Sequence, residues 1–302
     1  PLWASTAGGT IYLGDIGSSV QARTVGGNIG VEYVNGPAIL DTGGGEIRAG
    51  VINGPLTAET AGGDIVLQAA SGPVYVTTVG GQIRLGECGN SVRAQSAGGN
   101  IQVDGARGGV RAQTAGGNIT LLKAMSFVSA QTMAGRILAE IDANRQTFGP
   151  SRLETQIGDV NVFIPPALPV TIDAAIGHTM GHRIISDFPI KITGAGGSFG
   201  PESGSGQLNG GGHPLDIRTL MGNIQIRKLD PAAIARLEAS QKEFWKNWEQ
   251  FSHQRDATLG QMISVIQMMK LQRRDLQRQL RDLNKQLKDL AGENVDYVGG
   301  EQ

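Results

Sequence analysis

The sequence predicts a mainly β protein, in which a β-solenoid with 18-residue coils is followed by a C-terminal α-helical, coiled-coil segment. Three observations lead to this prediction. One sequence unit recurs eight times at a fixed spacing of 18 residues, from Ile11 to Ile137. Apolar and polar residues alternate within each unit, as they do in half-buried strands. After Pro231, proline is absent and glycine rare as far as Leu290, and a heptad pattern appears.

The repeated unit has three marker positions. An isoleucine stands at Ile11, Ile29, Ile47, Ile65, Ile83, Ile101, Ile119 and Ile137, and five residues before each stands a threonine or serine, from Thr6 to Thr132. A glycine precedes each isoleucine by two residues, at Gly9, Gly27, Gly45, Gly63, Gly81, Gly99, Gly117 and Gly135. A unit of this length is too short for a strand–helix–strand crossover, so each copy is one coil stacked on the next. We expect the glycines at corners with positive φ, where a Cβ would clash.

The alternation assigns side chains to the inside or the outside of the solenoid. Val110 and Ala112 are expected to point inward, whereas Arg111 points outward. One outward column is polar throughout and comprises Arg23, Asp41, Glu59, Thr77, Gln95, Gln113 and Gln131. Along this column we expect an Arg23–Asp41 contact and a ladder of stacked glutamine amides. The threonine column is expected to bond the turn or to stack on itself.

The regular coils span residues 1–137, and residues 138–229 are interpreted as larger, less regular coils that close the solenoid. The hydroxyl, glycine and branched-residue pattern returns at Thr155–Val160 and at Thr219–Ile224, and the last coil is expected at Leu215–Ile226. Strand-like runs lie at Val160–Ile164, Val170–Ala174 and Phe188–Ile192. The glycine-rich segment from Gly194 to Gly212 is expected to be a long surface loop.

Three strings in this half resemble a known family. They are D-V-N-V-F-I-P-P-A-L-P-V-T-I, then S-D-F-P-I, then L-N-G-G-G-H-P-L-D-I-R-T-L-M-G-N-I-Q-I. Over roughly residues 5 to 228 the chain resembles a bacterial family of β-strand-repeat proteins of unknown function that are described as candidate adhesins. The resemblance implies a β-solenoid associated with the bacterial envelope or cell surface. It brings no established catalytic residues.

Residues 230–292 are predicted to form an α-helical segment, and residues 293–302 a tail. Asp230 is a candidate N-cap, and Pro231 suits a first helical turn. We expect four aromatic residues to anchor the first half of this segment on a solenoid: Phe244, Trp245, Trp248 and Phe251. A heptad seam that includes Leu276, Leu280, Leu283 and Leu287 follows. The seam is expected to bridge to another subunit, and packing against the chain's own solenoid is the alternative.

The sequence offers no candidate for catalysis, cofactor binding or metal binding. His178 and His182 stand four residues apart, but Thr179 replaces the glutamate of a zinc-peptidase motif. Gly177 and Gly181 also favour a loop over a helix there. The glycine pairs lack the G-K-[ST] of a phosphate loop, and the carboxylates are scattered through different columns. We therefore predict a protein that is not an enzyme and has no cofactor.

Composition limits the classes of partner that the protein is expected to bind. A formal net charge of −1 gives no reason to expect nucleic-acid binding, and no run of 18 apolar residues is present to span a membrane. The single cysteine, Cys88, cannot form an internal disulfide. Its place in an apolar corner column indicates a small hydrophobic residue.

Three functions are compatible with this architecture. The first is a structural surface protein, extracellular or periplasmic, that assembles head to tail with copies of itself. It rests on the N-terminal edge, because the first coil starts close to Pro1 and leaves little sequence for a cap. The second is a monomeric adhesin that presents Tyr12, Tyr33, Tyr75 and the Gly194–Gly212 loop to a glycan or a protein. The third is a cytoplasmic scaffold of the bactofilin kind.

Overall fold

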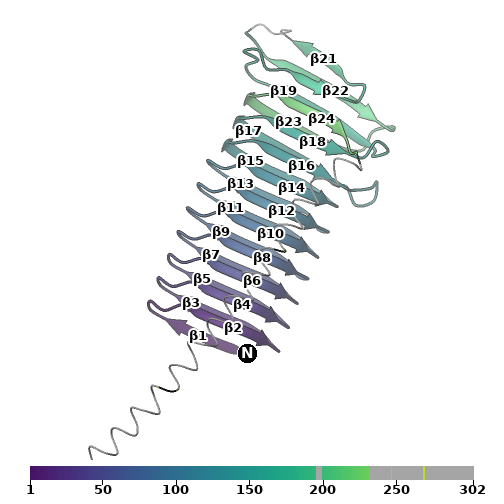
Figure 1. Cartoon of the computed structure of the whole chain (residues 1–302). Coiled ribbons are helices and arrows are strands. Elements are labelled where there is room, and N and C mark those ends of the chain that lie inside the picture. The colour runs from purple at the N-terminus through teal and green to yellow at the C-terminus, as the bar shows by residue number, and fades with distance from the viewer. Residues whose placement is uncertain (195–198, 231–245, 247–267, 269–302) are drawn as a thin grey trace, which may run out of the picture. The chain divides into compact units, whose positions relative to one another are not determined.

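The computed structural model describes residues 1–194, 199–230, 246 and 268, and it shows a mainly β protein whose parallel strands are stacked into two sheets (Figure 1). The chain divides into two compact units, Pro1–Arg236 and Leu237–Gln302, and the stacked strands belong to the first unit. The predicted anchor and seam residues lie outside the described residues: Phe244, Trp245, Trp248, Phe251, Leu276, Leu280, Leu283 and Leu287. The tail, 293–302, and all of the predicted helical segment except residues 230, 246 and 268 also lie outside them.

From β1 to β14, each coil contributes a five-residue strand to a first sheet and a six-residue strand to a second. In the described part of the chain the first sheet has 13 strands, in the order β1 (Leu2–Thr6), β3 (Val20–Thr24), β5 (Ala38–Thr42), β7 (Leu56–Thr60), β9 (Val74–Thr78), β11 (Val92–Ser96), β13 (Val110–Thr114), β15 (Val128–Ala134), β17 (Ser151–Ile157), β23 (His213–Met221), β19 (Val170–Ile176), β22 (Glu202–Leu208) and β21 (Lys191–Gly194). The second sheet there has 11 strands, in the order β2 (Ile11–Ile16), β4 (Ile29–Val34), β6 (Ile47–Ile52), β8 (Ile65–Ala70), β10 (Ile83–Cys88), β12 (Ile101–Ala106), β14 (Ile119–Ala124), β16 (Ile137–Ile141), β18 (Val160–Ile164), β24 (Ile224–Lys228) and β20 (Ile184–Ser186).

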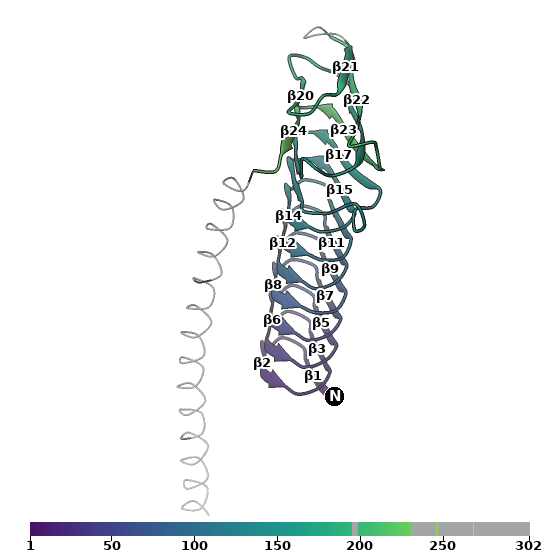
Figure 2. The same cartoon turned by 90° about the vertical axis from the view of Figure 1, so that its right-hand side faces the viewer.

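The register confirms that one coil follows the next at the period of the sequence. Equivalent residues pair in parallel, as Val92 does with Val110 and Ile83 with Ile101. The two sheets face each other along the stack (Figure 2), and their inward side chains form one continuous apolar core. Val110 is 1% exposed, whereas Arg111 is exposed, as the alternation predicts.

The hydroxyl column bonds the turn and also ties each coil to the one before it. Thr114 Oγ1 accepts a hydrogen bond from the Gly117 N–H (3.3 Å) and donates one to the carbonyl oxygen of Gly99 in the preceding coil (2.9 Å). At the same corner Asn100 Oδ1 accepts a hydrogen bond from the Asn118 N–H of the next coil (2.8 Å). These bonds satisfy backbone groups that the corner would otherwise leave unpaired.

The eight marker glycines lie at the corners, but the predicted reason for them is wrong. Within residues 1–194, positive φ at glycine is confined to Gly158, Gly181 and Gly194, so the markers do not need a left-handed backbone. Close approach is the cause in seven of them, from Gly27 to Gly135. A Cβ on any of these would lie 1.9–2.2 Å from the carbonyl oxygen of the equivalent glycine one coil earlier. At Gly9 the nearest atom is Thr6 Oγ1, at 3.3 Å.

The coil expected at Leu215–Ile226 is present as β23 and β24, and although it is the last coil along the chain it is not the last in the stack. β23 pairs in parallel with both β17 and β19, and β24 pairs in parallel with both β18 and β20. The coil of β23 and β24 therefore lies between two coils that precede it in the chain (Figure 1). Its markers engage the β17–β18 coil in the usual way, since Thr219 Oγ1 donates to the Gly158 carbonyl oxygen (3.0 Å).

An antiparallel pair follows this inserted coil in the first sheet. β22 runs antiparallel to β19 and to β21, so the predicted loop from Gly194 to Gly212 contains a seven-residue strand. The strand is glycine-rich because Ile190 packs over it: a Cβ on Gly206 would lie 2.8 Å from Ile190 Cγ2. The expected strands at Val160–Ile164 and Val170–Ala174 are present, whereas in Phe188–Ile192 only the last two residues are in a strand. No helix among the described residues is long and apolar enough to cross a membrane.

Candidate binding groove on the first sheet

The polar outward column of the first sheet forms the predicted ladder. Arg23 and Asp41 form an ion pair at 3.4 Å. Further along the stack, the Gln95 Nε2 donates to Gln113 Oε1 (2.8 Å), and the Gln113 Nε2 donates to Gln131 Oε1 (2.9 Å). The three amides are thereby held in one orientation on a rigid frame of parallel strands.

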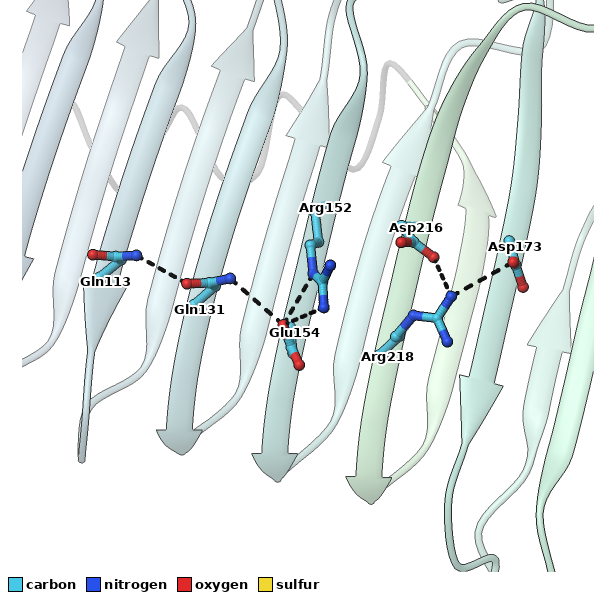
Figure 3. A network of polar contacts seen from close by, with 7 residues as sticks. All are labelled: Gln113, Gln131, Arg152, Glu154, Asp173, Asp216 and Arg218. Carbon is cyan, nitrogen blue, oxygen red and sulfur yellow. Dashed lines mark hydrogen bonds and ion pairs between the residues drawn. The ribbon is translucent and has the colours of Figure 1, made fainter.

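The ladder ends in charged groups, which Figure 3 shows from close by. Gln131 Nε2 donates to Glu154 Oε2 at 3.5 Å, and the same carboxylate pairs with Arg152 at 2.9 Å. In the next two coils Arg218 contacts Asp216 (2.8 Å) and Asp173 (3.6 Å). The hydrogen bond to Asp216, together with the negative charge of that carboxylate, raises the pKa of the Arg218 guanidinium above its usual value.

A groove of about 430 Å³ opens beside this ladder. Its lining residues come from four successive coils and are Gln95, Ser96, Gln113, Thr114, Ala115, Gln131, Thr132, Met133, Glu154 and Gln156. Ser96, Thr114 and Thr132 belong to the buried hydroxyl column, whereas the amides belong to the outward column. Because the lining residues follow the stack from β11 to β17, the groove suits an extended ligand that crosses several strands.

The amides retain unused hydrogen-bonding capacity. A glutamine side chain offers two N–H donors and a carbonyl oxygen with two lone pairs. Gln113 uses one donor and one acceptor in the ladder, so one N–H and one lone pair are left by these two bonds. Adjacent rungs repeat this pair of groups at the coil spacing of about 4.8 Å. The wall of the groove is therefore a periodic array of combined donors and acceptors.

The rest of the lining is uncharged or apolar. Glu154 is the one ionisable residue in the lining, and Arg152 offsets its charge. Met133 is 56% exposed, and Ala115 beside it is also exposed. Arg93 and Arg111 lie two residues before Gln95 and Gln113 on the same strands, but they do not line the groove. Arg111 instead lies over the ring of Phe127, 5.1 Å from its centroid.

The three tyrosines of the predicted adhesin surface are not brought together. Tyr12 and Tyr33 lie on strands of the second sheet, whereas Tyr75 lies on β9 of the first sheet and is 52% exposed. The hydroxyl of Tyr12 bonds the Glu32 carboxylate, and that of Tyr33 accepts a hydrogen bond from Asn53 Nδ2 (2.7 Å). These tyrosines therefore do not form a single binding surface.

The two histidines and the cysteine considered for metal or thiol chemistry lie in a loop and in the apolar core, respectively. His178 and His182 lie in a loop, as the flanking glycines predict, and no group of three or more metal-ligating side chains occurs in the described residues. Cys88 is 2% exposed and stacks between Ala70 and Ala106, which confirms its interpretation as a small hydrophobic residue. Burial raises the pKa of its thiol to about 12.

Sequence reasoning found the wall of the groove but missed the groove itself. The period of the sequence predicts the glutamine column, whereas Ala115, Met133 and Gln156 each follow the buried threonine of their coil, where the alternation of buried and exposed residues ends. The sequence feature that indicates a groove is the small side chain of Ala97 and Ala115, two residues after Gln95 and Gln113 of the glutamine column. Comparison with protein-family models, with curated proteins and with solved structures finds no match.

Proposed function

We propose that this protein is a non-enzymatic structural protein of the bacterial surface, and that its solenoid presents the groove of the first sheet to an extended ligand. The observation that carries the proposal is the hydrogen-bonded row of Gln95, Gln113 and Gln131, which fixes the binding groups before a ligand arrives. Groups that are already ordered lose little conformational entropy on binding. The surface location is the one that the resemblance to candidate adhesins implies.

Head-to-tail assembly has weaker support than ligand binding. In the described residues the last strand of the first sheet is the four-residue, antiparallel β21, and the last strand of the second sheet is the three-residue β20. Short edge strands offer few backbone groups to an incoming strand. A further parallel coil would find a poor template there, and we rank self-assembly second. Sedimentation velocity tests it, since a polymer must grow with protein concentration.

The proposal is tested by screening the folded protein against immobilised glycans and extended peptides. Gln113→Ala removes the central amide of the row, and Gln21→Ala removes a glutamine of the same sheet that does not line the groove. Each bond to a ligand contributes about 1 kcal/mol, and Gln113 can make one or two, so Gln113→Ala should weaken binding about five- to thirtyfold, and Gln21→Ala should leave it unchanged. Thermal unfolding of both variants should match the parent within a few degrees. The groove has no binding role if every ligand found binds Gln113→Ala as tightly as the parent.

A further inference from the structure

We infer that the ligand of the groove is a neutral, hydroxyl-rich glycan chain that lies along the stack of coils. The inference rests on the proposed function, because it names the class of ligand for the same groove. Three properties of the lining carry it: its chemistry, its spacing and its charge.

The chemistry of the wall matches hydroxyl groups. A hydroxyl both donates and accepts a hydrogen bond, and each rung of the amide row offers one N–H and one lone pair beyond those used in the row. The lining also includes exposed apolar groups at Ala115 and Met133. A pyranose ring carries hydroxyls around its edge and C–H groups on its faces, so it can contact both kinds of group.

The spacing of the rungs favours a glycan over a peptide. Rungs recur at about 4.8 Å, the distance between neighbouring strands. Side chains on one side of an extended peptide recur every two residues, at about 6.6 Å, and lose register with the rungs after a few steps. A β-linked pyranose unit is close to the rung spacing in length, so successive rings can keep register. The three glutamines of the row and Glu154 beyond them cross three intervals, or about 14 Å, which suits three to four rings.

The charge of the lining favours a neutral chain. Glu154, the one ionisable residue of the lining, is a carboxylate paired with Arg152 at 2.9 Å, so no lining residue is a cation that would bind a uronate or sulfate group. Arg93 and Arg111 could attract an anionic chain, but they lie outside the lining. A neutral chain needs neither of them.

Ala115→Trp tests the site by filling it. Ala115 lines the groove and is exposed, so an indole there displaces the ligand without entering the core. Ala61→Trp is the matched control, because Ala61 is exposed at the same position of a coil three repeats earlier and does not line the groove. Both variants should keep the far-ultraviolet circular dichroism spectrum and the melting temperature of the parent.

The ligands are neutral oligomers of β-linked glucose, mannose and N-acetylglucosamine, from disaccharide to hexasaccharide. The controls are oligogalacturonides of the same lengths and a flexible serine- and threonine-rich peptide. We expect Kd for at least one neutral series to fall with each added ring and to level off near the tetrasaccharide. Ala115→Trp should then weaken binding at least tenfold, Ala61→Trp should not, and salt should have little effect.

The outcomes separate the ligand class from the groove itself. Tighter, salt-sensitive binding of galacturonides, or binding of the peptide alone, would overturn the neutral glycan and leave the groove as the site, provided that Gln113→Ala and Ala115→Trp still weaken it. Binding of no neutral series overturns the inference as well. If a ligand binds and neither variant affects it, the proposed function of the groove fails together with the ligand class.

Discussion

Substituting each glycine of the Gly98–Gly99 pair in turn tests whether close approach to the preceding coil, and not positive φ, is the reason for a glycine at position 99. A Cβ on Gly99 would lie 1.9 Å from the Gly81 carbonyl oxygen and 2.4 Å from its carbon, and both atoms belong to backbone that cannot rotate away. On Gly98 the nearest atoms to a Cβ would be 3.9 Å away, and its φ is not left-handed. We therefore predict that Gly99→Ala is strongly destabilising and that Gly98→Ala is nearly silent.

The loss of unfolding free energy for Gly99→Ala can be estimated from the contacts that the new Cβ would disturb. Overpacking against an unyielding neighbour costs about 1–3 kcal/mol. Moving the coils apart also strains two hydrogen bonds, from Ser96 Oγ to the Gly81 carbonyl oxygen (3.0 Å) and from Thr114 Oγ1 to the Gly99 carbonyl oxygen (2.9 Å). At about 1 kcal/mol each, these bring the loss for Gly99→Ala to roughly 3–5 kcal/mol. Gly98→Ala should change stability by less than about 1 kcal/mol, and can raise it by restricting the unfolded chain.

Urea unfolding followed by circular dichroism measures both free energies, and thermal unfolding provides a second readout. For a unit of this size, 3–5 kcal/mol corresponds to a drop of roughly 6–20 °C in the melting temperature. Equal effects of the two substitutions would refute the argument, because only the distance to the preceding coil distinguishes them. A loss below about 1 kcal/mol for Gly99→Ala would show that the coils separate at little cost.

Three further predictions concern the core, the hydroxyl column and the cysteine. Val110→Asp buries an unpaired carboxylate and should abolish folding or cause aggregation, whereas Arg111→Asp should cost less than about 1 kcal/mol; equal damage would mean that the faces are exchanged. Thr114→Val keeps the shape but leaves the Gly99 carbonyl oxygen without its side-chain donor, so urea unfolding should show a loss of about 1–3 kcal/mol. Cys88 should resist alkylation at pH 8 until the protein is denatured. Because its folded pKa of about 12 exceeds the unfolded value of about 8.5, stability should fall as pH rises between these values, and Cys88→Ala should remove that part of the slope.

The regular coils were predictable because burial and period act on the same residues. Val110 and Ala112 had to face inward once Arg111 faced water, and the parallel register follows from a repeat without insertions. The glutamine row followed from the same argument. The reason for Gly99 was not predictable, because positive φ and close backbone approach both select glycine. Only the distance to Gly81 separates the two causes.

The groove was harder to predict than the row that walls it. Ala115 lies in a turn, and Met133 lies at the end of β15, where Met133 and Ala134 are both exposed, so alternation assigns neither side chain to one face. Gly98 and Gly116, which follow the equivalent residues Ala97 and Ala115, look the same in sequence as the close-packed glycines, although a Cβ on either would meet nothing closer than 3.7 Å. The 18-residue period therefore shows that both glycines of each pair recur, but it does not show which of the two the fold requires.

The inserted coil shows why the order of the stack cannot be deduced from the repeat alone. Thr219 Oγ1 donates to the Gly158 carbonyl oxygen at 3.0 Å, as the earlier hydroxyls do to the corner before them. This bond is the same at every corner, so it does not select the coil on which the last coil stacks. The pairing of β19 distinguishes this part of the stack. β19 pairs with antiparallel β22 on one side and with parallel β23 on the other. The coil of β17 offers the same parallel edge, and β23 fills the position between them, pairing with both. A coil that pairs the facing edges of β17 and β19 is favoured over one added outside the antiparallel pair, because the latter would meet only the short β21. The position of the last coil therefore agrees with the pairing of β17 and β19 on both sides, a property of the folded sheet that no single repeat encodes.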